Sequence, residues 1–281
     1  MIYRPLTATP FKCSTAYKET EPCEILKPYV RCFWGGEYQC SYAETEGNPT
    51  IVIPDTCVDI IYRMDSTGNI VFSDFNGIND SSFYVHNDRE VEHKMSVFAI
   101  RFYAWGAYIF SEDSFAGTVN GRYDVRERFN WLDRELRSRL SEPGDMGEII
   151  RLTEKLLINK LEAARGNELV DRAVNNMLLH RGALDISQLS KESFISSRQM
   201  ERVFHEYIGI TPKKLSNLVR YQFLWKDIVR QRDFDILDAV YRYGYTDTAH
   251  LMREFKRYHL MNIKEAKKIA FSDKFSVCES R

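Results

Sequence analysis

The 281-residue chain lacks several features that would place it in a specialised class. No apolar run approaches the ~18 residues that cross a bilayer, and the N-terminus lacks the segments of a signal peptide. Six cysteines form no CxxC or Cys/His spacing typical of a zinc site, and five of them lie between Cys13 and Cys57. We therefore expect a cytoplasmic protein without membrane spans. Its cysteines are interpreted as small core residues, with thiol sensing as an alternative.

Histidine is scarce in the first 164 residues, which contain only His86 and His93, with Glu90 and Glu92 between them. Barrel-shaped enzymes that hold a metal on histidines and a carboxylate favour a close His-x-His pair, and this pair is missing. The sequence therefore predicts no catalytic residue, no metal and no cofactor. A metal-dependent enzyme of the cupin type is kept as the least favoured alternative.

The formal net charge of -1 conceals an asymmetry between the two halves of the chain. From Arg165 onward there are 21 Lys and Arg against 15 Asp and Glu, whereas the first 164 residues hold 18 against 25. A basic second half is the electrostatic pattern of a nucleic-acid-binding domain. The excess of basic over acidic residues is modest, so the affinity for nonspecific DNA need not be high.

The first half contains short β-prone runs, such as TIVIPD and VFAIRFY, separated by turn-rich segments between about Ile25 and Phe110. This spacing predicts an antiparallel β barrel or sandwich, cupin-like in class, with flanking helices at 124–140 and about 146–163. The second helix has a wide apolar surface, which is either core or partly a homodimer surface. The expected fold is α+β and multidomain, divided into one domain at 1–164 and a second at 165–281.

Two stretches of the second half carry the same helical pattern. Ser196–Tyr207 and Asp247–Tyr258 superimpose with an offset of 51, and a shorter helical pattern precedes each copy. Each copy thus consists of a short helix followed by a longer one. This order predicts two helix-turn-helix units, at about 168–209 and 232–269, within an all-α domain. The second helix of such a unit enters the major groove of DNA.

One long helix is expected between the two copies, from Pro212 to Arg230. Thr211 is a suitable N-cap, proline suits the first turn, and the segment has no internal glycine. Nineteen residues at ~1.5 Å each give a rod of roughly 28 Å. Because grooves on one face of DNA recur every ~34 Å, such a rod could hold two reading helices about one turn apart.

The apolar periodicity of each copy indicates which residues face outward. In the first copy Met200 and Phe204 must face the core, and in the second Leu251 and Phe255 must do so. The opposite stripes can contact base edges, with arginine on guanine, glutamate on cytosine and apolar groups on thymine methyls. The alternative is a solvated ion-pair surface. The predicted DNA-binding residues are Ser197, Arg198, Glu201, Arg202, Thr248, Ala249, Met252, Arg253 and Lys256.

Further basic residues are candidates either for phosphate contacts or for ordinary solubility charge. They are Lys213, Lys214 and Arg220 on the expected rod, and Lys264, Lys267 and Lys268 in the last helix.

The second half resembles the AraC/XylS family of transcription regulators from about Glu168 to Ile269. The resemblance depends on the joint spacing of both units, including Gly244-Tyr245-Thr246-Asp247 with Arg253 in the second, and Arg202, Phe204 and Thr211-Pro212 in the first. The chain departs from the family pattern at Leu260, Asn262 and Ile263, and at Phe194, a turn position more often filled by glycine or a small polar residue. Asn262 can still cap the last helix.

The resemblance implies partners and a role for the first half, which is similar to one branch of that family. It implies binding to double-stranded promoter DNA, contact with RNA polymerase, and an N-terminal domain that binds a small-molecule effector or dimerises. Repression is equally compatible with these residues. A DNA-binding architectural protein without a switch is the main alternative.

If the first half senses a ligand, aromatic residues and a charge should line the barrel mouth. The candidates are Trp34, Tyr62, Tyr84 and Arg101, whereas Phe72 and Phe102 are interpreted as core. A charge on a strand rarely points inward without a partner. Asp55 or Asp59 is the expected partner of Arg101. Such an ion pair alone would account for an inward-pointing arginine and would leave no ligand role for it.

Overall fold

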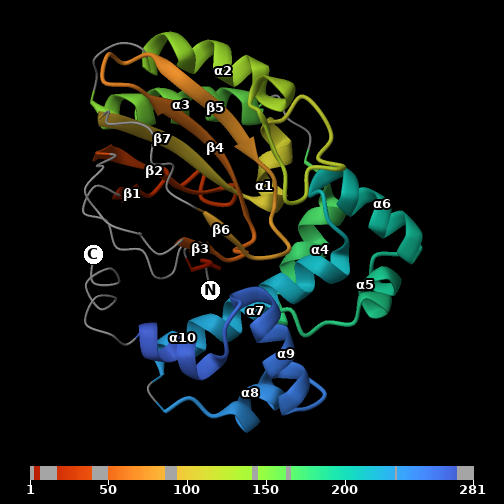
Figure 1. Cartoon of the computed structure of the whole chain (residues 1–281). Coiled ribbons are helices and arrows are strands. Elements are labelled where there is room, and N and C mark those ends of the chain that lie inside the picture. The colour runs from red at the N-terminus through yellow and green to blue at the C-terminus, as the bar shows by residue number, and fades with distance from the viewer. Residues whose placement is uncertain are drawn as a thin grey trace.

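The computed structural model describes residues 3–6, 18–39, 50–85, 94–140, 145–162, 166–231 and 233–270. Within these ranges the strands and three α-helices come first, and seven further helices follow (Figure 1). We call the first part the sheet domain and the second the helical region. An antiparallel β domain followed by an all-α region is confirmed. Among the helices in these ranges, none combines the length and the hydropathy that a membrane span requires.

The sheet domain is built on a six-stranded sheet of order β1-β2-β7-β4-β5-β8, in which all neighbours are antiparallel. A second sheet pairs β3 with β6. The two central strands are buried on both faces, so their sequence reads as nearly continuous apolar runs. The strands are β1 Lys18–Thr20, β2 Val30–Gln39, β3 Thr50–Val52, β4 Cys57–Met64, β5 Ile70–Asn76, β6 Phe83–Val85, β7 Lys94–Tyr103 and β8 Arg122–Asp124.

Two helices, α2 and α3, cover one face of the six-stranded sheet (Figure 1). Phe102 of the central strand β7 packs there against Phe110 and Phe129, with ring centroids 5.4 and 6.2 Å apart. The apolar side of α3 also packs on this core, which favours the core interpretation over a dimer surface. The helices of the sheet domain are α1 Ala104–Ala107, the 3-10 turn η1 Tyr108–Phe110, α2 Arg126–Leu140 and α3 Met146–Glu162.

The helical region begins with a helix that the sequence reasoning did not anticipate, α4, which is capped by Asn167. The helices of the two copies lie where the repeat predicted them, a last helix follows as expected, and α7 has the predicted bounds with Thr211 as its cap. The seven helices are α4 Glu168–Leu179, α5 Ile186–Glu192, α6 Ser197–Tyr207, α7 Pro212–Arg230, α8 Ile236–Arg242, α9 Thr248–His259 and α10 Ile263–Ala270.

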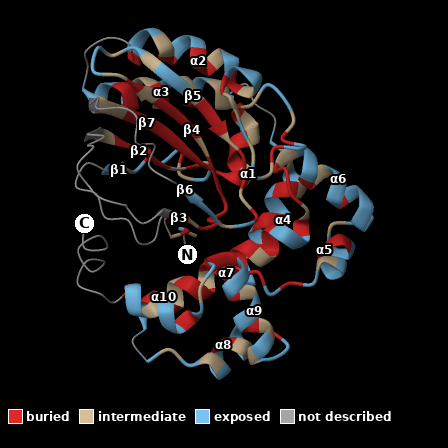
Figure 2. Ribbon diagram, in the orientation of Figure 1, coloured by how far each residue is buried: buried red, intermediate tan, exposed pale blue. Residues whose placement is uncertain are grey.

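Helix α7 forms the core of the helical region. It is buried along most of its length, whereas α5, α6, α8 and α9 expose their outer sides (Figure 2). Its neighbours are α4, α6, α9 and α10. Because buried residues lie on nearly all sides of α7, the helix must be enclosed by other elements. The two helix-turn-helix units are therefore mounted on one buried element.

The sheet domain contacts the helical region at several points. The amide of Phe115 donates to the carbonyl of Glu206 at the end of α6 (2.9 Å), and the rings of Tyr108 and Tyr207 lie 3.8 Å apart. Gly209 follows with φ +91°, and a Cβ there would lie 2.9 Å from the carbonyl oxygen of Phe115. Only glycine permits both this conformation and this close approach.

Phe102→Ala should lower the free energy of unfolding by about 3–5 kcal/mol, because it leaves a cavity among buried rings. The matched control is Phe72→Ala on β5, where the ring is 49% exposed and the change should stay below about 1 kcal/mol. Urea unfolding followed by circular dichroism measures both. Equal losses in the two variants would contradict the assigned core.

Candidate nucleic-acid interface

Helix α6 starts and packs as the first copy of the repeat requires. The side chain of Ser196 accepts a hydrogen bond from the amide of Gln199 (3.2 Å), which caps the helix. Met200 and Phe204 are fully buried, one turn apart on the inner side. The opposite side of α6 is consequently turned toward solvent.

Helix α9 repeats this arrangement 51 residues later. Asp247 caps it by accepting from the amide of His250 (2.6 Å), and Leu251 and Phe255 are fully buried. The next helix, α10, is capped by Asn262, whose side chain accepts from the amide of Glu265 (2.9 Å) while the Glu265 carboxylate accepts from the amide of Asn262 (3.1 Å). The predicted cap at Asn262 is confirmed.

The turns of the two units share one hydrogen-bond pattern. In the first unit the amide of Phe194 donates to Lys191 and that of Ile195 to Ser190; in the second, Gly244 donates to Tyr241 and Tyr245 to Val240. Phe194 and Gly244 have φ values of +55° and +63°. The left-handed conformation suits glycine and is uncommon for other residues. Phe194 thus occupies the glycine position at a conformational cost, with its ring 94% exposed.

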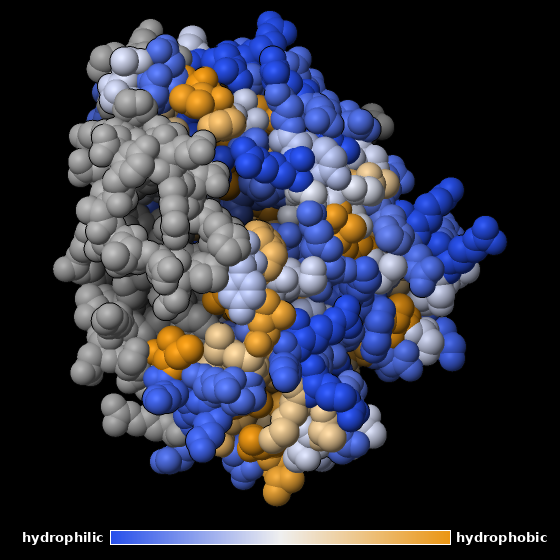
Figure 3. Space-filling view, viewed as in Figure 1, coloured by the Kyte–Doolittle hydropathy of each residue, from blue (hydrophilic) through white to orange (hydrophobic). Residues whose placement is uncertain are grey.

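The nine predicted DNA-binding residues all lie on the outer sides of α6 and α9. Eight are exposed and Thr248 is half-buried, and hydrophilic side chains dominate the surface over α6 (Figure 3). Within the described ranges, Arg198, Arg202 and Arg253 form no ion pair. Their guanidinium groups are therefore open to an external acceptor. The nine are Ser197, Arg198, Glu201, Arg202, Thr248, Ala249, Met252, Arg253 and Lys256.

Arg220 does not face the solvent, so its suggested phosphate contact is wrong. It lies in the middle of α7 with its side chain 7% exposed, and it forms a bidentate ion pair with Glu254 of α9, with nitrogen–oxygen distances of 3.1 and 2.7 Å. The hydroxyl of Tyr245 also donates to Glu254 (2.9 Å), and the guanidinium lies 4.3 Å from that ring. This pair fixes the second unit on α7.

Lys214, in the first turn of α7, is also engaged within the protein. Its ammonium group pairs with Asp80 of the sheet domain, whose other oxygen accepts from the side chain of Asn120 (2.6 Å). The lysine and these bonds hold the pKa of Asp80 below its usual range, against its desolvation. A phosphate contact by Lys214 would first require this pair to open. Lys213 beside it is exposed.

His259, the last residue of α9, is fully buried against α7. Its Nδ1 lies 2.7 Å from the hydroxyl of Tyr221, and its ring lies 4.3 Å from that of Trp225. Burial lowers the pKa of His259 to about 3. The unfolded chain therefore binds a proton at a higher pH than the folded one, and stability declines as the pH falls below the usual histidine pKa.

Two of the four predicted ligand-binding residues lie together on one face of the six-stranded sheet. Arg101 pairs with Asp55 and, at 3.6 Å, with Asp59, while the indole nitrogen of Trp34 donates to Asp59 (2.9 Å). Both expected partners of Arg101 are thus used. Burial raises the pKa of Asp55 to about 6 even though Arg101 opposes the shift. The neighbouring charge of Asp59 adds to the effect of burial, since two carboxylates share one guanidinium.

The other two candidates lie elsewhere, so the structure does not gather the four into one pocket. Tyr62 alternates onto the opposite face of β4, where it is fully buried against Phe98, with ring centroids 6.4 Å apart. Burial raises its pKa. Tyr84 is half exposed on β6, in the smaller sheet. Phe102 is core as expected, whereas Phe72 is half exposed.

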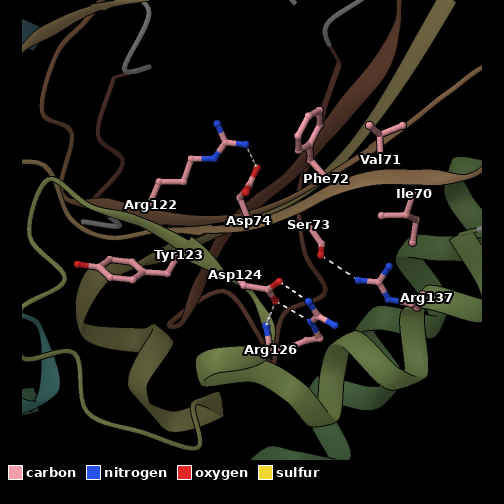
Figure 4. A pocket seen from close by; sticks show the side chains of 10 residues that line it. All are labelled: Ile70, Val71, Phe72, Ser73, Asp74, Arg122, Tyr123, Asp124, Arg126 and Arg137. Atoms are coloured by element: carbon pink, nitrogen blue, oxygen red, sulfur yellow. Dashed lines mark hydrogen bonds and ion pairs between the residues drawn. The ribbon is translucent and has the colours of Figure 1, made fainter.

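A groove of about 440 Å³ lies at the edge formed by β5, β8 and α2 (Figure 4). Two of its arginines form ion pairs with carboxylates that also line the groove: Arg122 with Asp74 (2.7 Å) and Arg126 with Asp124 (2.6 Å). Arg137 donates to the hydroxyl of Ser73 (2.9 Å). None of the predicted ligand-binding residues lines this groove. Its contacts attach β8 and α2 to the sheet edge.

The described part of the chain contains no group of three His, Cys, Asp or Glu side chains that could hold a metal ion. His86 and His93, with Glu90 and Glu92, lie outside the described residues. Cys23, Cys32 and Cys57 are free thiols, and burial raises the pKa of Cys32 and Cys57. Cys13, Cys40 and Cys278 lie outside the described residues.

Arg220→Ala should cost about 3–5 kcal/mol of stability, because it leaves the Glu254 carboxylate buried without its partner. Replacing both residues together, as Arg220→Met with Glu254→Met, should recover most of that loss. Arg202→Ala, the exposed control, should change stability by less than about 0.5 kcal/mol. Thermal unfolding measures all three. A loss in Arg202→Ala as large as in Arg220→Ala would refute the assigned roles.

Comparisons with known proteins agree with this organisation. Residues 189–268 match the family described as "Helix-turn-helix domain", and residues 18–122 match a family described as "Domain of unknown function". No curated protein matches the chain significantly.

Among solved structures, ToxT from Vibrio cholerae covers 85% of this chain and 99% of its own at 11% identity and a TM-score of 0.42. ToxT from Vibrio cholerae O395 covers 85% and 98% at 10% identity and a TM-score of 0.41. Residues 189–268 form a helix-turn-helix domain. This match, together with the repeated units and their exposed basic stripes, identifies the chain as a DNA-binding transcription regulator.

Proposed function

We propose that α6 and α9 each enter the major groove of the same promoter DNA and read two half-elements about one helical turn apart. The observation that carries the proposal is the equivalence of Arg202 and Arg253. They occupy the same position of the two copies, both are exposed, and neither pairs with a carboxylate within the described ranges. Each of these arginines has its guanidinium group available to donate two hydrogen bonds to the O6 and N7 atoms of a guanine.

The two stripes differ in chemistry, and this difference predicts two different half-elements. Arg198, Glu201 and Arg202 on α6 supply donors for guanine and an acceptor for the cytosine amino group. Ala249 and Met252 on α9 supply apolar contacts for thymine methyls beside Arg253 and Lys256. Ser197 and Thr248 lie in the first turns of α6 and α9, and we expect them to contact phosphates near the helix N-termini. The preferred site is therefore asymmetric.

We assign the signal-responsive role to the sheet domain, with 1–164 and 165–281 as the two functional units. Trp34 and Arg101 are the side chains best placed for an effector, because they share one face of the sheet with Asp55 and Asp59. Tyr62 and Tyr84 do not lie on this face, so an effector bound to Trp34 and Arg101 would have to extend beyond it to reach them. We further propose that the protein contacts RNA polymerase and forms a homodimer. An architectural protein without a switch remains the competing function.

Arg202→Ala and Arg253→Ala should each weaken binding to the preferred site by about 1–3 kcal/mol and relax selectivity at the half-element that each helix reads. Arg134→Ala, an exposed arginine on α2, is the matched control and should bind as the parent does. Fluorescence anisotropy on DNA selected from a random pool measures the affinities at one fixed salt concentration.

The same titrations separate the competing functions. An architectural protein would bind the selected and scrambled duplexes with similar affinity. If both arginine variants match the parent on every sequence, α6 and α9 do not read DNA.

A further inference from the structure

A strained turn joins β3 to β4 at the boundary between the sheet domain and α7. Thr56, at its centre, is fully buried and has φ +69°. A β-branched residue in the left-handed region is a genuine outlier, and such strain persists only where the surroundings impose it. The turn, Pro54–Cys57, is therefore held in place by its contacts. We call it the Thr56 turn.

On one side, the Thr56 turn is bound to the charged face of the sheet. Asp55 pairs with Arg101 and also accepts from the amide of Cys57 (3.1 Å), which closes the turn. The carbonyl of Thr56 accepts from the amide of Ala104 (3.0 Å), directly after β7. The ion pair and these bonds together hold Thr56 in its strained conformation.

On the other side, the Thr56 turn is bound to α7 through Gln222. This side chain is 1% exposed, and both ends of its amide are used on the N-terminal half of the chain. Its nitrogen donates to the carbonyl of Pro54 (2.7 Å), and its oxygen accepts from the amide of Leu6 (2.9 Å). A buried amide bound at both ends positions the helix that carries it.

We propose that the Thr56 turn is a latch that conveys the state of the Arg101–Asp55 ion pair to α7 through Gln222. When Arg101 is drawn from Asp55, Thr56 can leave the left-handed region, and the carbonyl of Pro54 withdraws from Gln222. The relieved strain is comparable in size to the hydrogen bond that is lost, so the two states of the turn are nearly balanced. Gln222 acts as a positioning residue.

The consequence for the reading helices follows from the neighbours of Gln222 on α7. Two residues before it, Arg220 holds α9 through Glu254. Six residues before it, the hydroxyl of Ser216 donates to the carbonyl of Gly182 (3.0 Å), in the loop between α4 and α5 of the first unit. Movement of this part of α7 displaces both units at once. The effect of the latch on DNA binding rests on the proposed function, in which both units read DNA.

Hydrogen exchange of the α7 amides in the full chain without DNA tests the latch. Asp55→Asn, which removes the charge and keeps the shape, should speed exchange in residues 215–229 by ~10-fold, since local opening of α7 becomes easier. Thr56→Gly removes the strain, so adding it to Asp55→Asn should bring exchange back to within ~3-fold of the parent. Phe194→Gly relieves the same strain at a distant turn and should give no rescue.

Gln222→Met supplies a second route in case Asp55→Asn fails to fold. It should speed the same amides, and Asp55→Asn should then add no further change, because both act through one contact. Unchanged α7 exchange in Asp55→Asn, or equal rescue by Phe194→Gly, would overturn the latch. The readout is independent of DNA recognition: Arg202→Ala should leave exchange unaltered whether or not α6 reads DNA.

Discussion

The enclosure of α7 is the constraint on which the rest of the structure depends. Within seven consecutive residues this helix directs three buried polar side chains to three different places: Ser216 to the loop between α4 and α5, Arg220 to α9, and Gln222 to the sheet domain. Buried polar groups are costly unless they are paired, so each contact fixes a partner as well as a distance. One element therefore sets the placement of α6 and α9 and their attachment to the sheet domain.

The helical region could be predicted from sequence because its signals are local. Thr211 with Pro212 marks the start of α7, Ser196 and Asp247 mark the starts of α6 and α9, and the apolar periodicity separates inner from outer residues. The repeat supplied what one copy could not, since an exposed charged stripe alone is ambiguous. Helix α4 was missed, although Asn167 followed by Val170, Val174 and Met177 carries the same kind of signal.

Contacts between distant residues could not be predicted in this way. Arg220 pairs with a carboxylate 34 positions away, and a helix buried nearly all round offers no polar face from which its orientation could be judged. Strand alternation places Tyr62 and Asp59 on opposite faces of β4, but both faces of the central strands are covered, so alternation did not reveal which one is core. The sequence marks Phe194 as a departure at a turn position, but only the backbone shows that it adopts the left-handed conformation that Gly244 adopts without strain.

The central claim is that a buried α7 holds two reading helices at one fixed spacing along DNA. Affinity for the selected site, measured as base pairs are inserted between its two half-elements, tests this most directly. An insertion of ~5 base pairs turns one half-element to the opposite side of the duplex, so affinity should fall to that of a single half-element. Binding that is indifferent to the insertion would show that the two helices do not act as one rigid pair.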